Sequence, residues 1–259
     1  MDATKKRKYK MRAIAFKILR TARSPISTLA VMKDFFKFKS SAGNSSRFRI
    51  SLLDLYPIAH ENTPTTAFDR HYVYHPAWAA RVVKEINPPF HVDISSTLHF
   101  CSILSAFIPV HFYDYRPAEL ALSDLETKRG DLMALPFENN SVKSISCMHT
   151  LEHIGLGRYG DPLDPDGDVK AINELKRVTA KGGSLLIVVP LGIPRIEYNA
   201  HRIYSYEKIT ELVLDDNFSL KEYAYIPQRT EEGPLLRYAD KNKGIDASYA
   251  CGCFWFLKK

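Results

Sequence analysis

The sequence predicts an α/β protein with a doubly wound, mostly parallel sheet. Two observations support this fold class. Short β-type runs alternate with helical patterns along most of the chain, and the run "SLLIVVP" (184–190) is apolar without alternation, as in a strand buried on both faces. A chain of 259 residues, 45% of them hydrophobic, can also bury a sizeable core. We therefore expect one main domain, with helices on both faces of its sheet.

Helix and strand signals place the individual elements. Pro76 in a first turn opens one helix, Gly182 and Gly183 end another, and Ser205 is the expected N-cap of a third. The predicted helices cover residues 76–86, 97–107, 168–180 and 205–216. The predicted strands cover residues 89–95, 110–115, 141–149, 184–190, 219–227 and 249–259. The two element types alternate until the last two strands, which close the sheet.

The N-terminal part of the chain is strongly basic. Residues 1–49 carry 14 Lys and Arg against two acidic residues, which leaves 22 basic and 27 acidic residues in the rest. "MRAIAFKILRTA" has apolar residues at helical spacing beside cations, and "ISTLAVMKDFFKFK" predicts a second short helix after Pro25. "SSAGNSS" (40–46) is typical of a linker. We expect basic amphipathic helices and a linker over 1–46, and the main domain over 47–259.

Two interpretations of the basic helices stay open. They suit an anionic membrane surface, and they equally suit solvated helices docked on the main domain. Nucleic acid is less favoured, because aromatic residues are not repeatedly interleaved with the basic cluster. No apolar run approaches the ~18–20 residues that cross a bilayer. The expected location is cytoplasmic, peripheral on the inner face of the membrane if the helices bind lipid, with four buried, reduced cysteines.

Three acidic residues are expected at the carboxyl ends of strands, where parallel sheets bind ligands. Asp93 ends the first strand, Asp114 ends the second, and Asp131 opens a later loop. The 21 residues from Asp93 to Asp114 match the ~20 expected between a phosphate or sulfonium loop and a carboxylate that binds a ribose diol. Asp131 is expected to meet an adenine amino group, while Leu132 covers the ring. These residues predict a nucleoside-containing cofactor.

Several segments of the sequence resemble known families. "DLMALPFENNSVKSISCMHTLEHIG", followed by "AINELKRVTAKGGSLLIVVP", resembles the second half of class I S-adenosylmethionine-dependent methyltransferases, over roughly residues 88–226. "FDRHYVYHPAWAAR", "LEHIGLGRYGDPLDPDG" and "YNAHRIYSY" resemble a bacterial methyltransferase-like family of unassigned function from surface-polysaccharide gene clusters. The resemblance implies a Rossmann-like, seven-stranded fold and S-adenosylmethionine as cofactor. For the narrower family the resemblance implies a fold and a neighbourhood and not an activity. The methyl acceptor that we expect is a hydroxyl or phosphate-linked group of a surface glycan, or of its nucleotide- or lipid-linked sugar precursor.

The loop after the first strand departs from the family pattern. Class I methyltransferases usually have glycines there, because the backbone approaches the cofactor where a Cβ would collide. This loop contains no glycine, and Ser95 and Ser96 occupy the corresponding places. Serine is small and its hydroxyl can bind a carboxylate, so we expect a modified cofactor pocket. The alternative is a loop that only caps the next helix beside a closed pocket.

The segment after the fourth strand supplies the expected catalytic groups. His153 is the predicted general base, because an imidazole titrates near working pH, and Glu152 would orient it. His149 is the rival base. The residues expected to hold the acceptor are Arg158, Asn199, His201, Arg202, His71 and His75. The last two lie in "DRHYVYH", which we expect to fold over the pocket as a lid.

The acidic run at 161–168 favours ordinary turns over a metal site, and magnesium, which some sugar methyltransferases use, stays open as the alternative. Gly167 stands at the fourth place from Asp164, whereas an EF-hand loop has its glycine at the sixth, and the composition is that of ordinary turns. Three functions stay open: a methyltransferase, a non-catalytic scaffold in glycan assembly that has lost its cofactor site, and a different transferase on the same fold. A titration with S-adenosylmethionine would distinguish the first from the second.

Overall fold

The computed structural model describes residues 25–43, 47–58, 61–94 and 97–259. The chain divides into two compact units, Met1–Ala67 and Phe68–Lys259, so the division falls later than the expected boundary after residue 46. In the first unit, α2 (Pro25–Ala42) confirms the second predicted helix, and η2 (Leu52–Asp54) is a short 3-10 helix. The helix predicted before Pro25 lies outside the described residues. Within the described ranges, no helix is long and apolar enough to cross a membrane.

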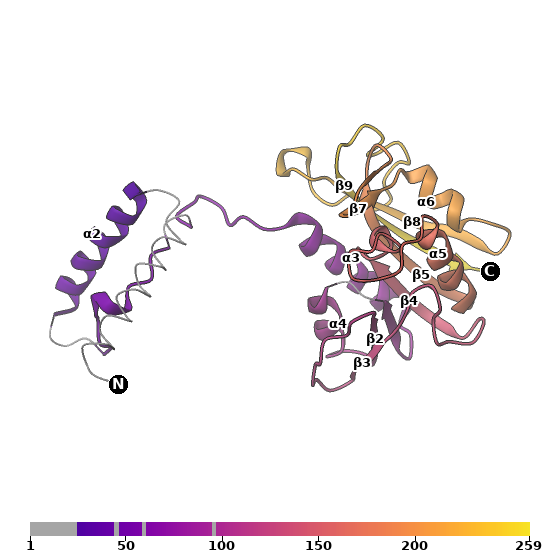
Figure 1. The fold of residues 1–259 in the computed structure, drawn as a ribbon, viewed down its shortest axis with the longest axis horizontal. Coiled ribbons are helices and arrows are strands. Elements are labelled where there is room, and N and C mark those ends of the chain that lie inside the picture. Colours follow the sequence, from indigo (N-terminus) through magenta and orange to yellow (C-terminus); the bar gives the residue numbers. More distant parts are fainter. Residues whose placement is uncertain (1–24, 44–46, 59–60, 95–96) are drawn as a thin grey trace. The chain divides into compact units, whose positions relative to one another are not determined.

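The second unit is built on a seven-stranded sheet with the order β3-β2-β1-β4-β5-β9-β8 (Figure 1). The strands are β1 (His91–Ile94), β2 (Val110–Asp114), β3 (Leu125–Arg129), β4 (Val142–Met148), β5 (Thr179–Leu191), β8 (Phe218–Ile226) and β9 (Ala250–Lys258). The first five pair in parallel, while β9 runs antiparallel between β5 and β8. The strand order reverses at β1, which confirms the doubly wound, mostly parallel sheet and marks the expected ligand edge. A separate hairpin pairs β6 (Arg195–Glu197) with β7 (His201–Ile203).

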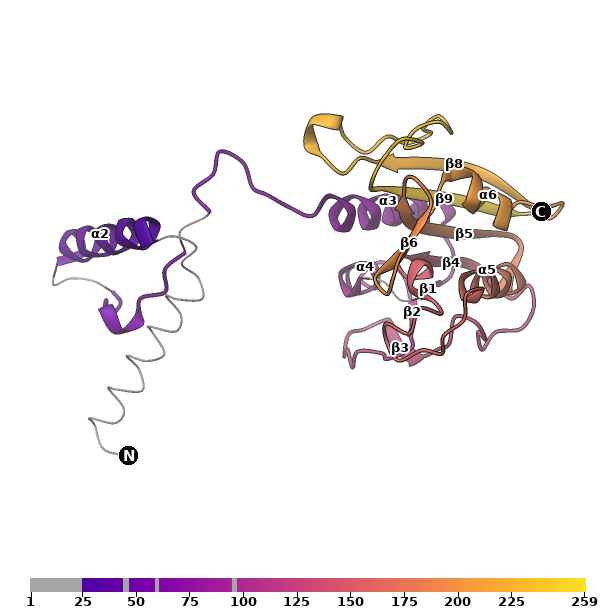
Figure 2. The same cartoon turned by 45° about the horizontal axis from the view of Figure 1, so that its top comes forward.

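Helices cover both faces of this sheet (Figures 1 and 2). They are α3 (Arg70–Ile86), α4 (Leu98–Leu104), α5 (Gly167–Val178) and α6 (Tyr206–Val213). The first two pack together over one core that contains Trp78 and Phe112, and the last two over another that contains Ile172 and Ile209. Because β5 contributes to both cores, its central residues are apolar on both faces.

The start of α3 corrects the sequence prediction. The helix begins at Arg70, and Pro76 lies inside it. Asp69 is the N-cap, and its carboxylate accepts a hydrogen bond from the backbone N–H of Tyr72 (3.1 Å). This cap pairs a backbone N–H that the first turn of a helix otherwise leaves without a partner. Its stabilisation of the helix offsets the loss of the one backbone hydrogen bond that Pro76 cannot make. The segment expected to be a lid is therefore the first two turns of a helix.

The glycine pair after α5 has a different role from the one predicted. The helix ends at Val178, and Gly182 and Gly183 lie inside β5, where the register between β4 and β5 shifts. Gly182 has a φ of +70°, and a Cβ on Gly183 would lie 2.8 Å from the carbonyl oxygen of Ala180. The two glycines thus permit an irregularity in the strand. The N-cap at Ser205 is confirmed, because its side chain accepts from the N–H of Lys208 (3.2 Å).

A buried carboxylate joins α3 to β8. Glu222, which is 1% exposed, accepts hydrogen bonds from the Trp78 indole (2.9 Å) and from Nε of Arg237 (2.8 Å). We expect Glu222→Ala to lower the free energy of unfolding by about 1–3 kcal/mol, because the buried indole N–H loses its partner. Urea denaturation measures the loss. Glu222→Gln keeps an acceptor and should lose less, so equal losses in the two variants would contradict this role.

Candidate active site

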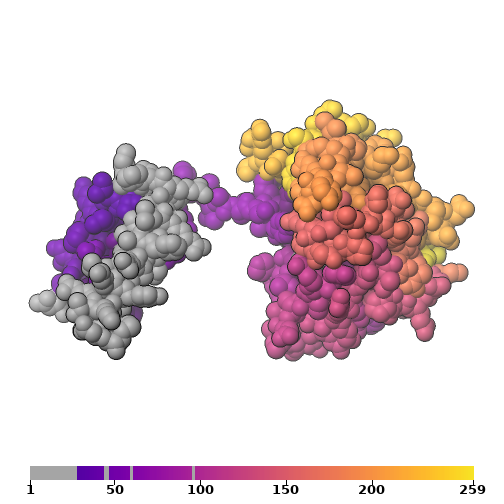
Figure 3. All heavy atoms as spheres, viewed as in Figure 1, coloured from indigo at the N-terminus to yellow at the C-terminus, as the bar shows by residue number. Residues whose placement is uncertain are grey.

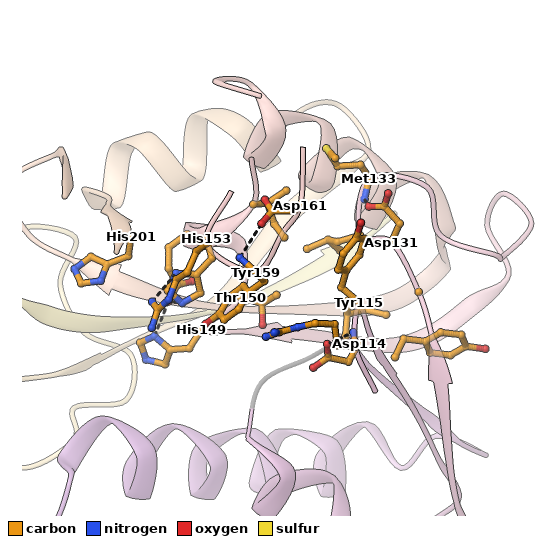
Figure 4. Close-up of a pocket in the computed structure, with 18 of the residues that line it drawn as sticks. Asp114, Tyr115, Asp131, Met133, His149, Thr150, His153, Tyr159, Asp161 and His201 are labelled. Carbon is orange, nitrogen blue, oxygen red and sulfur yellow. Dashed lines mark hydrogen bonds and ion pairs between the residues drawn. The ribbon is translucent and has the colours of Figure 1, made fainter. Parts of the chain in front are cut away.

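A pocket of about 420 Å³ opens at the carboxyl ends of β1 to β4. This volume lies within the ~300–1,000 Å³ typical of small-molecule sites. Its lining includes the residues that end or follow these four strands, Ile94, Asp114, Gly130 and His149. Figure 4 shows two chemically different ends. Asp114 and Asp131 form what we call the acid end, and His149, His153 and His201 form the histidine end.

The acid end is formed by the turns that follow β2 and β3. The carboxylate of Asp114 accepts from the N–H of Arg116 (2.7 Å), and that of Asp131 accepts from the N–H of Met133 (2.9 Å). Leu132 is 4% exposed and lines the same pocket. The structure therefore brings together three of the residues expected at the cofactor. Carboxylates beside an apolar side chain can bind the hydroxyl and amino groups of a nucleoside.

Asp93 does not line the pocket. It is fully buried, and it accepts a hydrogen bond from the hydroxyl of Ser146 in β4 (2.5 Å). Burial raises the pKa of Asp93 to about 7, although the hydrogen bond from Ser146 acts to lower it. This carboxyl therefore joins β1 to β4 through one oxygen, and its Oδ2 is buried without a partner among the described residues. Ser95 and Ser96, which were expected to contact the cofactor, lie outside the described residues.

Glu152 lies at the centre of the histidine end. Its Oε1 is 2.9 Å from Nδ1 of His149 and 3.8 Å from Nε2 of His153. Both ring nitrogens of His149 have neighbours, because its Nε2 is 3.5 Å from Sγ of Cys251. Nδ1 of His153 donates to the carbonyl of Ala200 (2.7 Å), a contact that fixes the tautomer and leaves the Nε2 lone pair to accept a proton. His153 is therefore better placed than His149 to act as a base.

The surroundings of His153 keep its ring neutral and oriented. Burial lowers its pKa, and Arg158 and His201 act in the same direction, whereas Glu152 raises it; the net pKa is below the usual histidine value. A neutral imidazole at pH 7 is the form that a general base requires. Tyr159 packs edge-on against His153, with ring centroids 5.6 Å apart, and Arg158 lies over the Tyr159 ring.

A loop rich in glycine supplies Arg158 and Tyr159 to the pocket. The Asp161 carboxylate accepts from the N–H groups of Gly155 (2.9 Å), Gly157 (3.3 Å) and Tyr159 (3.1 Å), and so holds the loop in one shape. Gly155 has a φ of +79°, and a Cβ there would lie 2.0 Å from a backbone carbonyl oxygen. Any other residue at this position would collide with that oxygen and would need a strained backbone conformation. In the space-filling view, the red segment around η3 (Leu151–His153), which precedes this loop, lies beside the orange segment around β7 (Figure 3).

Four residues expected to bind the acceptor do not line the pocket. Arg202 is 5% exposed and donates to two backbone carbonyls of the loop after β4, at 2.6 and 3.1 Å, so it braces that loop. Asn199 lies exposed between β6 and β7. His71 and His75 are four residues apart in α3, on the helix face that packs against the sheet, and both are buried. Arg158 and His201 do line the pocket, as predicted from their positions after strands.

Aromatic residues, most of which the sequence analysis did not single out, complete the lining. They are Tyr72, Tyr113, Tyr115, Tyr159 and Tyr249. Tyr115 and Arg116 directly follow the end of β2, and that position was a usable signal. Tyr72 belongs to "DRHYVYH", the segment expected to cover the pocket, whereas Tyr249 comes from a distant segment that no local pattern links to the pocket. Arg116 lies 4.8 Å from the ring centre of Tyr159, so a cation–π contact connects the two sides of the lining.

The strand order and the seven-stranded sheet define the fold of class I S-adenosylmethionine-dependent methyltransferases. The structure aligns with Burkholderia thailandensis 1,6-didemethyltoxoflavin-N1-methyltransferase, solved with S-adenosylhomocysteine bound, at a TM-score of 0.53 and 11% identity over 92% of each chain. A putative methyltransferase from Bacillus halodurans aligns at a TM-score of 0.48 and 15% identity, over 71% of this chain and 98% of that one. An S-adenosylmethionine-dependent methyltransferase from Thermotoga maritima aligns at 0.47 and 16%, over 73% and 91%. At 11% identity, the first of these alignments shows a shared fold.

The sequence comparisons say less about function. A family model described as "Caenorhabditis protein of unknown function, DUF268" matches residues 136–222, the stretch from the loop before β4 into β8. The matched stretch includes the histidine end of the pocket and excludes Asp114 and Asp131. The comparison with curated proteins finds no match.

Proposed function

We propose that the protein is an S-adenosylmethionine-dependent methyltransferase. The observation that supports this most strongly is the acid end, where Asp114 and Asp131 follow adjacent strands and line one pocket beside the reversal of strand order. In this proposal Asp114 holds the ribose hydroxyls, and Asp131 with Leu132 holds the adenine. A bound cofactor would supply an electrophilic methyl group. The pocket volume and the acidic lining both fit such a group.

The histidine end would bind the methyl acceptor. His153 accepts the acceptor's proton at Nε2, while Nδ1 stays anchored to a backbone carbonyl, and Glu152 stabilises the resulting positive charge. Arg158 offers a guanidinium to an anionic part of the acceptor. For the acceptor we propose a hydroxyl or phosphate-linked group of a surface glycan or of its nucleotide- or lipid-linked precursor. Imidazole and guanidinium groups are suited to sugar hydroxyls and phosphates.

Calorimetric titration of the full-length protein with S-adenosylmethionine and S-adenosylhomocysteine tests the proposal. We expect one-to-one binding of both. The glycine-free loop after β1 favours a second candidate, a non-catalytic scaffold that keeps the fold without the cofactor. If neither ligand binds to protein that is shown to be folded, the result would support the scaffold function and contradict the methyltransferase function.

We also propose that the first unit binds an anionic membrane surface. In α2, Leu29, Phe36 and Phe38 are exposed beside Lys33 and Lys37. Each cation near such a surface contributes about 1 kcal/mol, and salt screens this attraction.

Vesicle sedimentation tests the membrane proposal. We expect the full-length protein to sediment with anionic vesicles at low salt and to be released at high salt. Removal of residues 1–40, or replacement of Lys33 and Lys37 by glutamate, should reduce sedimentation. Equal sedimentation of the full-length and shortened proteins would exclude this role.

A further inference from the structure

Three potential metal ligands from distant parts of the chain lie together behind the histidine end. His71 is in the first turn of α3, His149 follows β4, and Cys251 is in β9. One donor atom of each lies within 4.8 Å of the other two. The exposed fractions of the three residues are 6%, 7% and 0%. Because these residues are far apart in sequence, no spacing motif could have revealed the cluster.

A carboxylate orients the central histidine. Nδ1 of His149 donates to Oε1 of Glu152 (2.9 Å), so Nε2 is directed at Sγ of Cys251, 3.5 Å away. Histidines that bind metals commonly donate their other ring N–H to a carboxylate, which fixes the ring and makes it more basic. His149 therefore already has the orientation and the outer partner of a metal ligand.

Two neighbouring histidines have unpaired nitrogens. Nε2 of His71 and Nε2 of His75 are buried and have no hydrogen-bond partner among the described residues. A buried polar atom without a partner is unfavourable, so both nitrogens would gain from a polar or cationic partner. Nε2 of His71 is therefore a nitrogen ligand available for a cation.

The thiol completes the set of donors. Cys251 is a fully buried, free thiol in β9. A bound dication stabilises the thiolate, and binding then releases one proton from Cys251 to solvent. The negative charge of the thiolate partly neutralises the ion. The four cysteines are all free, and no disulfide competes for this sulfur.

We propose that His71, His149 and Cys251 bind a divalent transition metal of the zinc class through two imidazole nitrogens and one thiolate. This donor set favours Zn²⁺ over Mg²⁺ and Ca²⁺, which prefer oxygen ligands. Bonds of ~2.0–2.3 Å in a tetrahedral site place ligand atoms about 3.5 Å apart. His149 and Cys251 already have this separation, and His71 reaches the ion by a small side-chain movement.

The proposed metal site adjoins the pocket. His149 and Tyr249 both line the pocket. The ring of Tyr249 stacks on that of His71, with ring centroids 5.2 Å apart. Three protein ligands leave a fourth position for water or a ligand, as in zinc sites that take part in reactions. The inference does not depend on methyl transfer, because all three ligands lie away from the acid end. Its test accordingly uses metal binding and not activity.

Cobalt serves as the probe, because Co²⁺ bound by a thiolate gives a charge-transfer absorption in the near ultraviolet. We expect full-length protein freed of metal by a chelator to bind one equivalent of Co²⁺ with this absorption, and Zn²⁺ to displace it. Cys251→Ser should abolish the absorption. Cys253→Ser is the matched control, because this second buried thiol of β9 lies 4.0 Å from Cys251 but outside the ligand set; it should keep the absorption. Glu152→Gln should weaken Zn²⁺ binding about 10- to 100-fold.

Several outcomes would overturn the inference. They are absence of a one-to-one Co²⁺ complex in the folded wild type, persistence of the absorption in Cys251→Ser, or its loss in a folded Cys253→Ser variant. If Cys251→Ser fails to fold, as judged by circular dichroism, His71→Ala decides the matter. Unchanged Zn²⁺ affinity in His71→Ala would remove this histidine from the site and contradict the proposal, whereas a marked loss would support it.

Discussion

Replacing His153 with alanine is expected to lower the rate of the proposed methyl transfer by about 10²- to 10⁴-fold while the affinity for S-adenosylmethionine changes little. An attacking hydroxyl must lose its proton, and Nε2 of His153 is the ring position in the histidine end that the Ala200 contact leaves available. The side chain lies away from Asp114 and Asp131, which separates its effect from cofactor binding (Figure 4). Single-turnover rates with an identified acceptor measure the loss.

The pH dependence provides an independent check on this base. Because the pKa of His153 is lowered by burial, the active neutral form persists below the usual histidine value of ~6.5. The wild-type rate should fall only as the pH drops through that lowered pKa, and His153→Ala should lose this limb. His149→Ala is the comparison variant. A wild-type rate in His153→Ala across pH 6–9, with a strong loss in His149→Ala, would transfer the role to His149.

Asp114→Ala is expected to remove measurable binding of S-adenosylmethionine and to leave the fold intact. Hydrogen bonds from two ribose hydroxyls to a carboxylate contribute about 1.5–3 kcal/mol each, so their loss corresponds to about 10²- to 10⁴-fold in affinity. Calorimetry measures the affinity, and circular dichroism checks the fold. Glu119→Ala is the matched control, because this acid lies exposed in the same loop and does not line the pocket. Undiminished binding by Asp114→Ala would remove the ribose role.

The fold could largely be predicted, because its elements carry local signals. The parallel core strands are apolar runs, and Ser205 is a recognisable cap. β3 was missed, because in "LETKR" only Leu125 is buried and the strand lies at the sheet edge, where charged side chains are tolerated. The predicted start of α3 at Pro76 is wrong, because Asp69 caps the helix and Pro76 lies inside it.

The candidate site divides in the same way. Asp114 was predicted at the pocket because it ends a recognisable strand, and Asp131 because it opens a loop and precedes an apolar residue; both line the pocket. The same reasoning placed Arg202 and Asp93 at the pocket, and neither residue lines it. The guanidinium of Arg202 binds backbone carbonyls, and Asp93 is buried between strands. Whether a polar side chain faces a pocket or a neighbouring element depends on packing, and one sequence does not show it. The contribution of β9, which brings Cys251 to His149, depends on the same kind of long-range contact.

The insertion of β9 between β5 and β8 has a consequence for the protein's synthesis. β8 emerges from the ribosome before β9, yet β9 is its neighbour in the sheet, and eight residues of β5 (184–191) also pair with β9. Until residues 250–258 are made, β5 has an open apolar edge and β8 has no strand to join. Unpaired edges of this kind bind other chains. At ~5–20 residues per second, the stretch from residue 227 to 258 takes about 2–6 s to translate, and a pause there would prolong the interval in which nascent chains are prone to aggregate.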